Sequence, residues 1–222
     1  MAFSLFGSKN WLAATALLLT ACMSSSSANA SELRLFGDIS LNDTAEYVSS
    51  LPGSFECSAL YDDKPAFCFD QLQVLNVDEG MLSVFLVDQK VRYVEYSTSL
   101  TAANYSAVLA GLRRKGLVFA HLSVHGETLD VLAGIQNLDR KTLDDQMFAL
   151  ANRYDFTAPR QYLFLDKGAF NHAYRRGYKN VDHWLTSGAT DDMAKEQHMM
   201  VKMSVSGEQI ILSVAYPFAK ND

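Results

Sequence analysis

Cysteine and proline are scarce in this 222-residue chain, which has three cysteines and four prolines. No Cys-x-x-Cys pair, glycine-rich phosphate loop or Gly-x-Ser-x-Gly motif occurs in the sequence. Thiol redox enzymes, P-loop enzymes and α/β-hydrolases depend on these motifs, so the sequence argues against all three classes. The chain also lacks an apolar run of about 18 residues or more, the length that spans a membrane as a helix.

Basic residues are fewer than acidic ones, with 19 Lys and Arg against 25 Asp and Glu. The net charge of -6 argues against nucleic acid as a partner, because nucleic acid selects basic surfaces. Hydrophobic residues make up 49% and charged residues 20% of the chain, as in an ordinary globular protein. The length suits one large domain or two small ones.

A short apolar segment near the N-terminus predicts export. Trp11–Ala21 follows Lys9 and has the length of a signal-peptide core, too short to span a bilayer. The segment ends in Leu19-Thr20-Ala21-Cys22, which resembles the bacterial lipobox. The resemblance implies a signal peptide over residues 1–21 and a lipid on Cys22. Because Met23 rather than Asp follows the cysteine, it further implies an anchor in the outer membrane that faces the periplasm.

The serine run Ser24–Ser27 suits a flexible tether over residues 22–40 that separates a domain from its membrane. Cleavage after Ala30 is the competing interpretation, because Ala28-Asn29-Ala30 also fits a small-residue cleavage site. Cleavage there would release a soluble periplasmic or secreted protein. That site lies about nine residues beyond the apolar segment, which favours the lipoprotein interpretation.

Export leaves Cys57 and Cys68 in an oxidising compartment, where an even pair of cysteines is typical of a disulfide. Asp62–Pro65 predicts a turn between them, so the two cysteines can face each other across a hairpin. Closing this short loop should contribute about 2–3 kcal/mol. A metal or redox site would need more ligands or a closer cysteine spacing, so we expect a structural disulfide.

The clearest folding signals lie between Met81 and Gly116. Met81–Val87 and Val91–Ser97 predict two strands joined by a polar turn. Thr101 is a suitable N-cap for a helix that Gly116 ends. The apolar stripe of this helix consists of Tyr105, Val108, Leu109 and Leu112.

Further elements are predicted on both sides of this unit. Upstream we expect an edge strand over 33–36, a helix capped by Asn42 or Asp43, and strands over 55–61 and 66–77.

Downstream we expect a strand over 117–125, a helix that begins at Thr142, a strand over 161–166 and a hairpin of 198–205 with 208–216. The predicted face of the Thr142 helix consists of Leu143, Met147, Leu150 and Tyr154. Residues 167–197 are polar and contain three glycines, so they predict a loop with at most one helix.

This order predicts an α+β fold with helices packed on one face of an antiparallel sheet. Residues 41–125 form a first module that contains the disulfide. Residues 126–222 form a second part, either a degenerate repeat of the first module or the completion of its sheet. Two tandem modules remain a hypothesis, because the halves share no visible sequence identity.

The first module resembles a loose class of small bacterial envelope domains in which a helix precedes a disulfide-bearing antiparallel sheet. The residues that carry the resemblance over about 41–116 are LNDTAEYVSSL, Cys57, Cys68, VDQKVRYVEY and NYSAVLAGLRRKG. His183-Trp184 and the hairpin HMMVKMSVSGEQIILSVAY are similar to the ends of some members. Known members are outer-membrane assembly lipoproteins of the SmpA/OmlA type and tandem inhibitors of the β-lactamase-inhibitor kind. The resemblance implies binding of other proteins and places no binding residue.

Histidines and paired carboxylates give no catalytic or metal-binding pattern, so we expect no enzyme activity, metal or cofactor. On a strand, His121 and His125 would be about 13 Å apart, too far to share a zinc ion. His183 beside Thr186-Ser187 supports only a remote alternative, a hydrolase. The acidic pairs fall at turns or helix starts, where carboxylates cap backbone amides: Asp62-Asp63, Asp144-Asp145 and Asp191-Asp192.

The candidate binding residues are aromatic or basic. Tyr93 and Glu95 share one strand face and Tyr96 lies on the other, so an exposed aromatic face would suit protein binding, although aromatic residues also fill cores. Arg175 and Arg176, flanked by tyrosines, are candidates to contact an anion or a partner. We expect a protein-binding or assembly factor at the outer membrane that contacts another envelope protein. The alternative is a periplasmic inhibitor or immunity protein that neutralises an enzyme or toxin.

Overall fold

The computed structural model describes residues 34–187 and 198–219. The predicted signal peptide, Cys22, the serine tether and Asp191-Asp192 lie outside these residues. The strands are β1 Arg34–Phe36, β2 Ile39–Ser40, β3 Phe55–Glu56, β4 Ala66–Phe69, β5 Met81–Val87, β6 Lys90–Ser99, β7 Leu117–Val124, β8 Glu127–Asp130, β9 Arg160–Asp166, β10 Met200–Ser206 and β11 Gln209–Ala215. The helices are α1 Ala45–Ser50, η1 (a 3₁₀ turn) Ser58–Tyr61, α2 Ala102–Arg114, α3 Val131–Asn137, α4 Arg140–Ala151, α5 Lys167–Arg175 and α6 Val181–Ser187.

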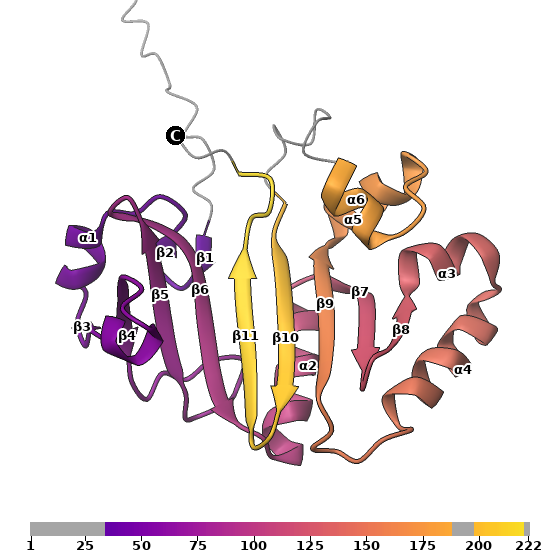
Figure 1. The fold of residues 1–222 in the computed structure, drawn as a ribbon, viewed down its shortest axis with the longest axis horizontal. Helices are drawn as coiled ribbons and strands as arrows, with labels where there is room; N and C mark the ends of the chain where they lie inside the picture. Colours follow the sequence, from indigo (N-terminus) through magenta and orange to yellow (C-terminus); the bar gives the residue numbers. More distant parts are fainter. Residues whose placement is uncertain (1–33, 188–197, 220–222) are drawn as a thin grey trace, which may run out of the picture. The chain divides into compact units, whose positions relative to one another are not determined.

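Nine strands form one antiparallel sheet in the order β3-β4-β5-β6-β11-β10-β9-β7-β8 (Figure 1). The fold is therefore α+β, as the sequence predicts. β8 to β11, from residues 126–222, belong to this same sheet, because β11 pairs with β6. Residues 34–40, assigned to the tether from the sequence, form the separate β1–β2 pair. Among the described helices, none has the length and apolar character of a membrane span.

The β5–β6 hairpin and α2 form where the sequence predicts them. Asp88 and Gln89 have φ values of +51° and +62°, as a two-residue type I′ turn requires. The side chain of Thr101 accepts a hydrogen bond from the backbone N–H of Asn104 at 3.0 Å and caps α2. Gly116, with φ +79°, lets the chain leave the helix and start β7 at once.

One face of the sheet carries the main hydrophobic core. A row of side chains crosses seven strands in register on this face, and six of its seven members are buried: Leu82, Tyr96, Leu212, Met203, Tyr162 and Leu122, followed by the partly buried Leu129. α2 lies behind the sheet in Figure 1 and packs Val108 and Leu112 into this core. The apolar stripe predicted for α2 is therefore confirmed.

A second core lies on the opposite face, so the expectation that helices pack on one face is wrong. Phe164 of β9 belongs to the main core, whereas the next residue, Leu165, points the other way and packs with α3, α5 and α6. Trp184 of α6 and Leu132 of α3 are completely buried there. Two small residues, Ala169 and Ala173, let α5 approach the strands closely.

Residues 167–187 form two helices, where the sequence predicts a loop with at most one, and 127–137 form the unpredicted β8 and α3. The buried residues of α5 are alanines, which give little apolar signal in a sequence. α3 is short and contains Gly134, a poor helix former. A Cβ atom at this glycine would lie 2.5 Å from Leu143 Cδ1, so a larger residue here would require the buried Leu143 side chain to shift.

Several predicted boundaries are also wrong. The strand predicted over 66–77 ends at Phe69, because Gln71, Leu75 and Asn76 have positive φ values that a strand does not contain. The strand predicted over 55–61 ends at Glu56, whose carboxylate accepts the Ser58 N–H at 2.8 Å where η1 begins.

The helix caps are displaced as well. Thr44, rather than Asn42 or Asp43, caps α1 by accepting the Tyr47 N–H at 3.2 Å. Asp139 caps α4, so this helix begins before Thr142, and it ends before Tyr154.

Candidate functional site

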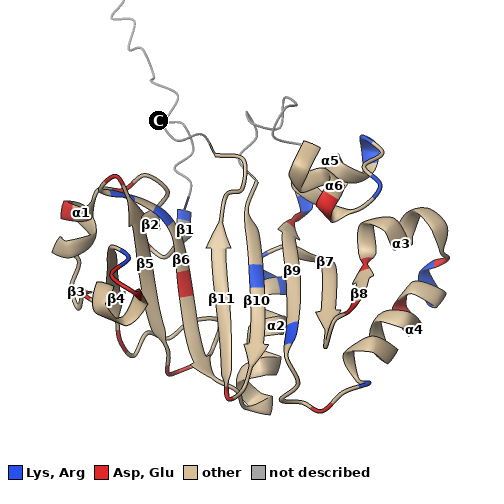
Figure 2. Cartoon of the chain, viewed as in Figure 1, with Lys and Arg blue, Asp and Glu red and all other residues tan. Residues whose placement is uncertain are grey.

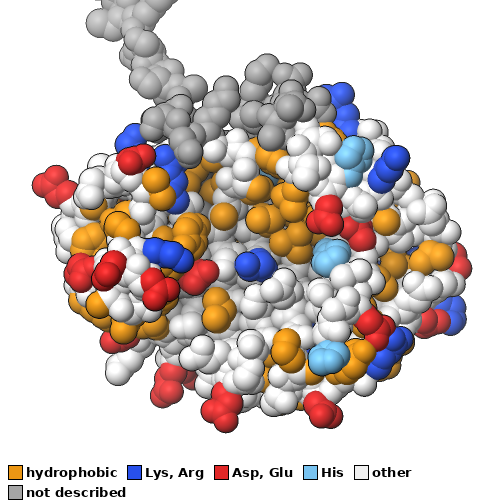
Figure 3. All heavy atoms as spheres, in the orientation of Figure 1, with side chains coloured by type: hydrophobic (Ala, Val, Ile, Leu, Met, Phe, Trp, Pro, Cys, Tyr) orange, Lys and Arg blue, Asp and Glu red, His pale blue; other side chains and the backbone are white. Residues whose placement is uncertain are grey.

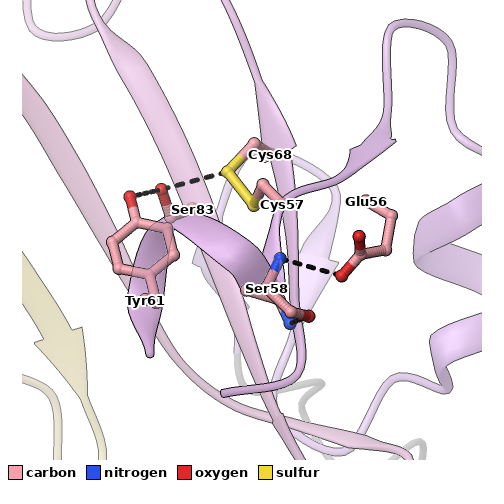
Figure 4. The surroundings of a disulfide bond; sticks show 7 residues. Glu56, Cys57, Ser58, Tyr61, Cys68 and Ser83 are labelled. Atoms are coloured by element: carbon pink, nitrogen blue, oxygen red, sulfur yellow. Dashed lines mark hydrogen bonds between the residues drawn. A yellow bond between two sulfur atoms is a disulfide. The ribbon is translucent and has the colours of Figure 1, made fainter. Parts of the chain in front are cut away.

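The predicted disulfide is confirmed. Cys57 and Cys68 are joined with an S–S distance of 2.06 Å and a Cα–Cα distance of 5.8 Å (Figure 4). Asp62 and Asp63 adopt left-handed conformations in the turn between them. The bond fastens the β3–η1 segment over one end of the sheet, where both sulfurs are buried.

Next to this segment, the central strands present a face that we call the open face. Its first row runs across seven strands in register and consists of Ser83, Glu95, Ser213, Lys202, Leu163, His121 and Asp130. Its second row consists of Met81, Ser97, Ile211, Ser204, Gln161, Ser123 and Thr128. Within these rows only Ser83 is buried, in contrast to the apolar row of the opposite face.

Figure 2 marks an acidic position on β6 and a basic position on β10 in the middle of the sheet, and these are Glu95 and Lys202. In the space-filling view, charged and histidine side chains are set among hydrophobic ones on this face (Figure 3). Ser213, between the two charged residues in register, donates its hydroxyl to Glu95 Oε1 at 2.8 Å. The Lys202 side chain is exposed, and its ammonium group makes no hydrogen bond or ion pair to another described residue.

Tyr93 lies where the open face meets the β3–η1 segment. Its ring stacks on Phe85 at a centroid distance of 4.5 Å, and Phe85 in turn meets the edge of Tyr61. Burial of the Tyr93 hydroxyl raises its pKa, and the Glu95 carboxylate raises it further. Tyr93 therefore presents a neutral, preorganised phenol to the open face at neutral pH.

The other predicted binding residues lie elsewhere. Tyr96 is only 1% exposed and is a core residue, with its hydroxyl donating to the Leu72 carbonyl at 3.4 Å. Burial of this kind does not fit the predicted contact with a partner. Arg175 and Arg176 are exposed at the end of α5, which follows β9, and β11 and β10 separate β9 from the strand of Tyr93. The structure does not bring the four candidates together.

The histidines have separate surroundings. His121 lies on the open face opposite Asp130, whose carboxylate caps α3 and accepts the Val181 N–H at 2.7 Å. His125 adopts φ +50° in the turn after β7. His183 Nδ1 accepts the Lys179 N–H at 3.2 Å. Within 34–187 and 198–219, no group of three or more His, Cys, Asp or Glu side chains has a metal-binding arrangement.

One histidine forms a close pair with a carboxylate. His198 Nδ1 lies 3.2 Å from Asp166 Oδ2, and Asp166 also caps α5 by accepting the Ala169 N–H at 2.8 Å. Burial would raise the pKa of Asp166, but the hydrogen bonds from His198 and Ala169 outweigh it and hold the pKa below its ordinary value. The Asp166–His198 pair connects β9, α5 and the residues before β10. Its role is therefore structural, at the end of the sheet.

The sequence does not predict the open face as a whole, because it depends on pairing between β6 and β11. The available signal is the alternation in the last hairpin, where Lys202, Ser204 and Ser213 interrupt the hydrophobic residues with a period of two. That pattern indicates that one face of the hairpin is exposed to solvent, but it does not identify the strands that pair with the hairpin.

Comparisons with known proteins give no relative: no protein family matches the chain, and neither does any curated protein or solved structure.

Proposed function

We propose that this protein is a lipid-anchored, non-enzymatic factor of the bacterial envelope that binds another envelope protein through the open face. The observation that carries the proposal is the contrast between the two sides of the same strands. One side is an apolar core, and the other is a half-exposed surface that mixes serine, charged, aromatic and aliphatic side chains. Such mixtures of polar and apolar groups are typical of protein interfaces.

The sheet supports this role because it holds the open face rigidly. Four strands, β6, β11, β10 and β9, are paired over most of their length. Their side chains need little ordering on binding, which lowers the entropic cost of association. The disulfide-bonded segment beside Tyr93 borders this surface on one side, and the α3–α5–α6 core borders it on the other.

The lipobox and the serine run support the location. A lipid on Cys22 would stand twelve residues before Arg34, the first described residue. An extended segment of that length reaches about 40 Å, enough for the domain to meet a partner at or away from the membrane surface.

Strand connectivity supports the proposal that the domain arose from two tandem modules. β4-β5-β6 and β9-β10-β11 are both three-stranded antiparallel units, and their last strands, β6 and β11, pair with each other antiparallel. Two copies related by a twofold axis between β6 and β11 would have this arrangement.

In-cell chemical crosslinking of the tagged protein, followed by mass spectrometry, tests the function. Ser204→Arg places a large cation in the centre of the open face, and Ser106→Arg makes the same change on the exposed side of α2. We expect an envelope protein to be recovered with the wild type and Ser106→Arg and lost with Ser204→Arg. Equal recovery with both variants would contradict the proposed surface.

Cys22→Ala separates the anchor from the binding surface. We expect outer-membrane partners to be recovered only when the anchor is intact, because the lipid places the domain beside them. Recovery of a soluble enzyme with either form would indicate the inhibitor class instead.

A further inference from the structure

A groove on the sheet face opposite the open face lies between α2 and α4. Its volume is about 720 Å³. Leu117, Phe119 and Leu122 of β7 form its floor together with Tyr162 and Phe164 of β9. Tyr105, Leu109 and Arg113 of α2 line it on one side, and Met147, Phe148 and Ala151 of α4 line it on the other. Ligand pockets in proteins have volumes of about 300–1,000 Å³ and mostly apolar linings, and this groove has both properties.

Phe148 is the most exposed large hydrophobic residue that lines the groove. Its side chain is 71% exposed, the highest value among the large hydrophobic residues of the described chain. Leaving a phenyl ring in water forgoes a substantial hydrophobic stabilisation. Several partly buried apolar residues of the floor and walls, such as Phe119 and Leu109, also remain accessible from the groove.

The two ends of the groove differ in chemistry. Arg113 and Lys167 line the end where β7 begins and β9 finishes. Tyr105 and Tyr162 line the other end, where their hydroxyls hydrogen-bond to each other. Between these ends, the described lining is apolar apart from backbone, and it contains no Asp or Glu.

The two cations at one end of the groove indicate the chemical class of the ligand. Both cations are exposed, and neither has an ion pair with another residue of the described chain. Two unpaired cations beside a groove without carboxylates contrast with a chain whose net charge is -6. This end of the groove therefore complements an anion.

The length of the groove floor indicates the shape of the rest of the ligand. The floor extends along β7 from Leu117 to Leu122, a distance of about 17 Å at the usual rise per strand residue. An apolar trough of this length accommodates an extended alkyl chain. We propose that the groove binds a single-chain amphiphile with an anionic head, a long-chain fatty acid, with its carboxylate at Arg113 and Lys167 and its alkyl chain along the floor.

Equilibrium binding of radiolabelled palmitate to the delipidated full chain tests this inference. Cys22→Ala is used throughout, so that a lipid attached at residue 22 does not compete. Hexadecanol has the same alkyl chain without the charge, and octanoate has the same head on a short chain. We expect palmitate to bind more tightly than either, because only palmitate satisfies both the cations and the full length of the floor.

Matched variants locate the site. Ala151→Phe places a ring in the groove, and Ala149→Phe makes the same change on the exposed side of α4. We expect Ala151→Phe to weaken palmitate binding about tenfold and Ala149→Phe to leave it unchanged. Arg113→Gln and Lys167→Gln should each weaken binding about two- to fivefold, whereas Arg114→Gln, one residue outside the lining, should not.

If Ala151→Phe is unfolded at room temperature, Phe148→Ala is measured in its place. The exposed ring of Phe148 would contact the ligand, and its removal leaves the core intact. Absence of palmitate binding would overturn the inference. So would equal binding of palmitate and hexadecanol, or equal effects of the two alanine substitutions. Binding of an acidic amphipathic peptide in place of palmitate, blocked by Ala151→Phe, would identify a peptide-docking groove and also overturn it.

Discussion

Ser213 on β11 donates its hydroxyl to the Glu95 carboxylate on β6 at 2.8 Å, and 118 residues separate the two in the chain. The bond lies on the open face, at the junction between strands from the first and second parts of the chain. The junction brings the charged and polar side chains of both parts onto one continuous surface. The proposed binding role therefore depends on a pairing that neither part makes alone.

Removal of the disulfide should destabilise the domain. Cys57→Ser/Cys68→Ser frees a loop of about a dozen residues in the unfolded chain, at an expected cost of about 2–3 kcal/mol. Urea unfolding of the oxidised, reduced and double-variant proteins measures this cost. The reduced wild type should match the double variant. Equal midpoints for the oxidised and reduced proteins would contradict the structural role of the bond.

Gly111→Ala should destabilise the protein, although alanine is the better helix former. A Cβ atom at residue 111 would lie 2.7 Å from Leu75 Cβ and 2.9 Å from Leu75 Cδ2. Overpacking of this kind costs about 1–3 kcal/mol, more than the gain in helix propensity of about 1 kcal/mol. The measurement is the free energy of unfolding of the variant against wild type.

Leu75→Gly provides the control for this prediction. Leu75 has φ +53°, a conformation that glycine adopts freely, and the change removes both clashing atoms. In the Leu75→Gly background, Gly111→Ala should be neutral or stabilising. If Gly111→Ala costs the same in both backgrounds, the contact with Leu75 is not the cause.

The free energy of unfolding should depend on pH in the acid range because of Asp166. Its pKa is lower in the folded protein than its unfolded value near 3.8, because His198 and the Ala169 N–H bind the charged form. The carboxylate thus stabilises the fold above that value, and the contribution is lost as pH falls from 3.8 through the folded pKa. Asp166→Asn keeps an N-cap side chain and removes the charge.

Unfolding by urea from pH 3 to pH 7 tests this prediction. Asp166→Asn should be less stable than wild type at neutral pH, and the difference should shrink below about pH 3.8. Asp182→Asn makes the same substitution at an exposed position of α6 and is the control. A constant difference for Asp166→Asn would show that its charge is not involved.

Local signals in the sequence are sufficient to predict the β5–β6 hairpin and α2. The polar break Asp88-Gln89-Lys90 predicts the turn, Thr101 suits the cap, and Val108 and Leu112 lie on one helix face. Each depends on residues within one or two turns of chain, which is the range over which backbone preferences act. The disulfide is predicted for a similar reason, since both cysteines lie within one short hairpin.

Features that depend on contacts between distant segments cannot be predicted from local sequence signals. The pairing of β6 with β11 and the placement of helices on both faces are decided by packing between remote segments. Helix α5 buries alanines and α3 contains Gly134, so close packing there weakens the very patterns that identify helices. The sequence makes Tyr96 a candidate for binding, because strand alternation alone does not tell which face of the sheet is covered.

Site-specific photo-crosslinking tests the central claim, that the open face binds a partner protein in the envelope. A photoreactive residue at Lys202, exposed in the middle of the open face, is compared with one at Ala110, exposed on α2 behind the sheet. We predict a discrete adduct with an envelope protein at residue 202 and none at residue 110. Adducts at residue 110 alone, or at neither position, would contradict the proposed function.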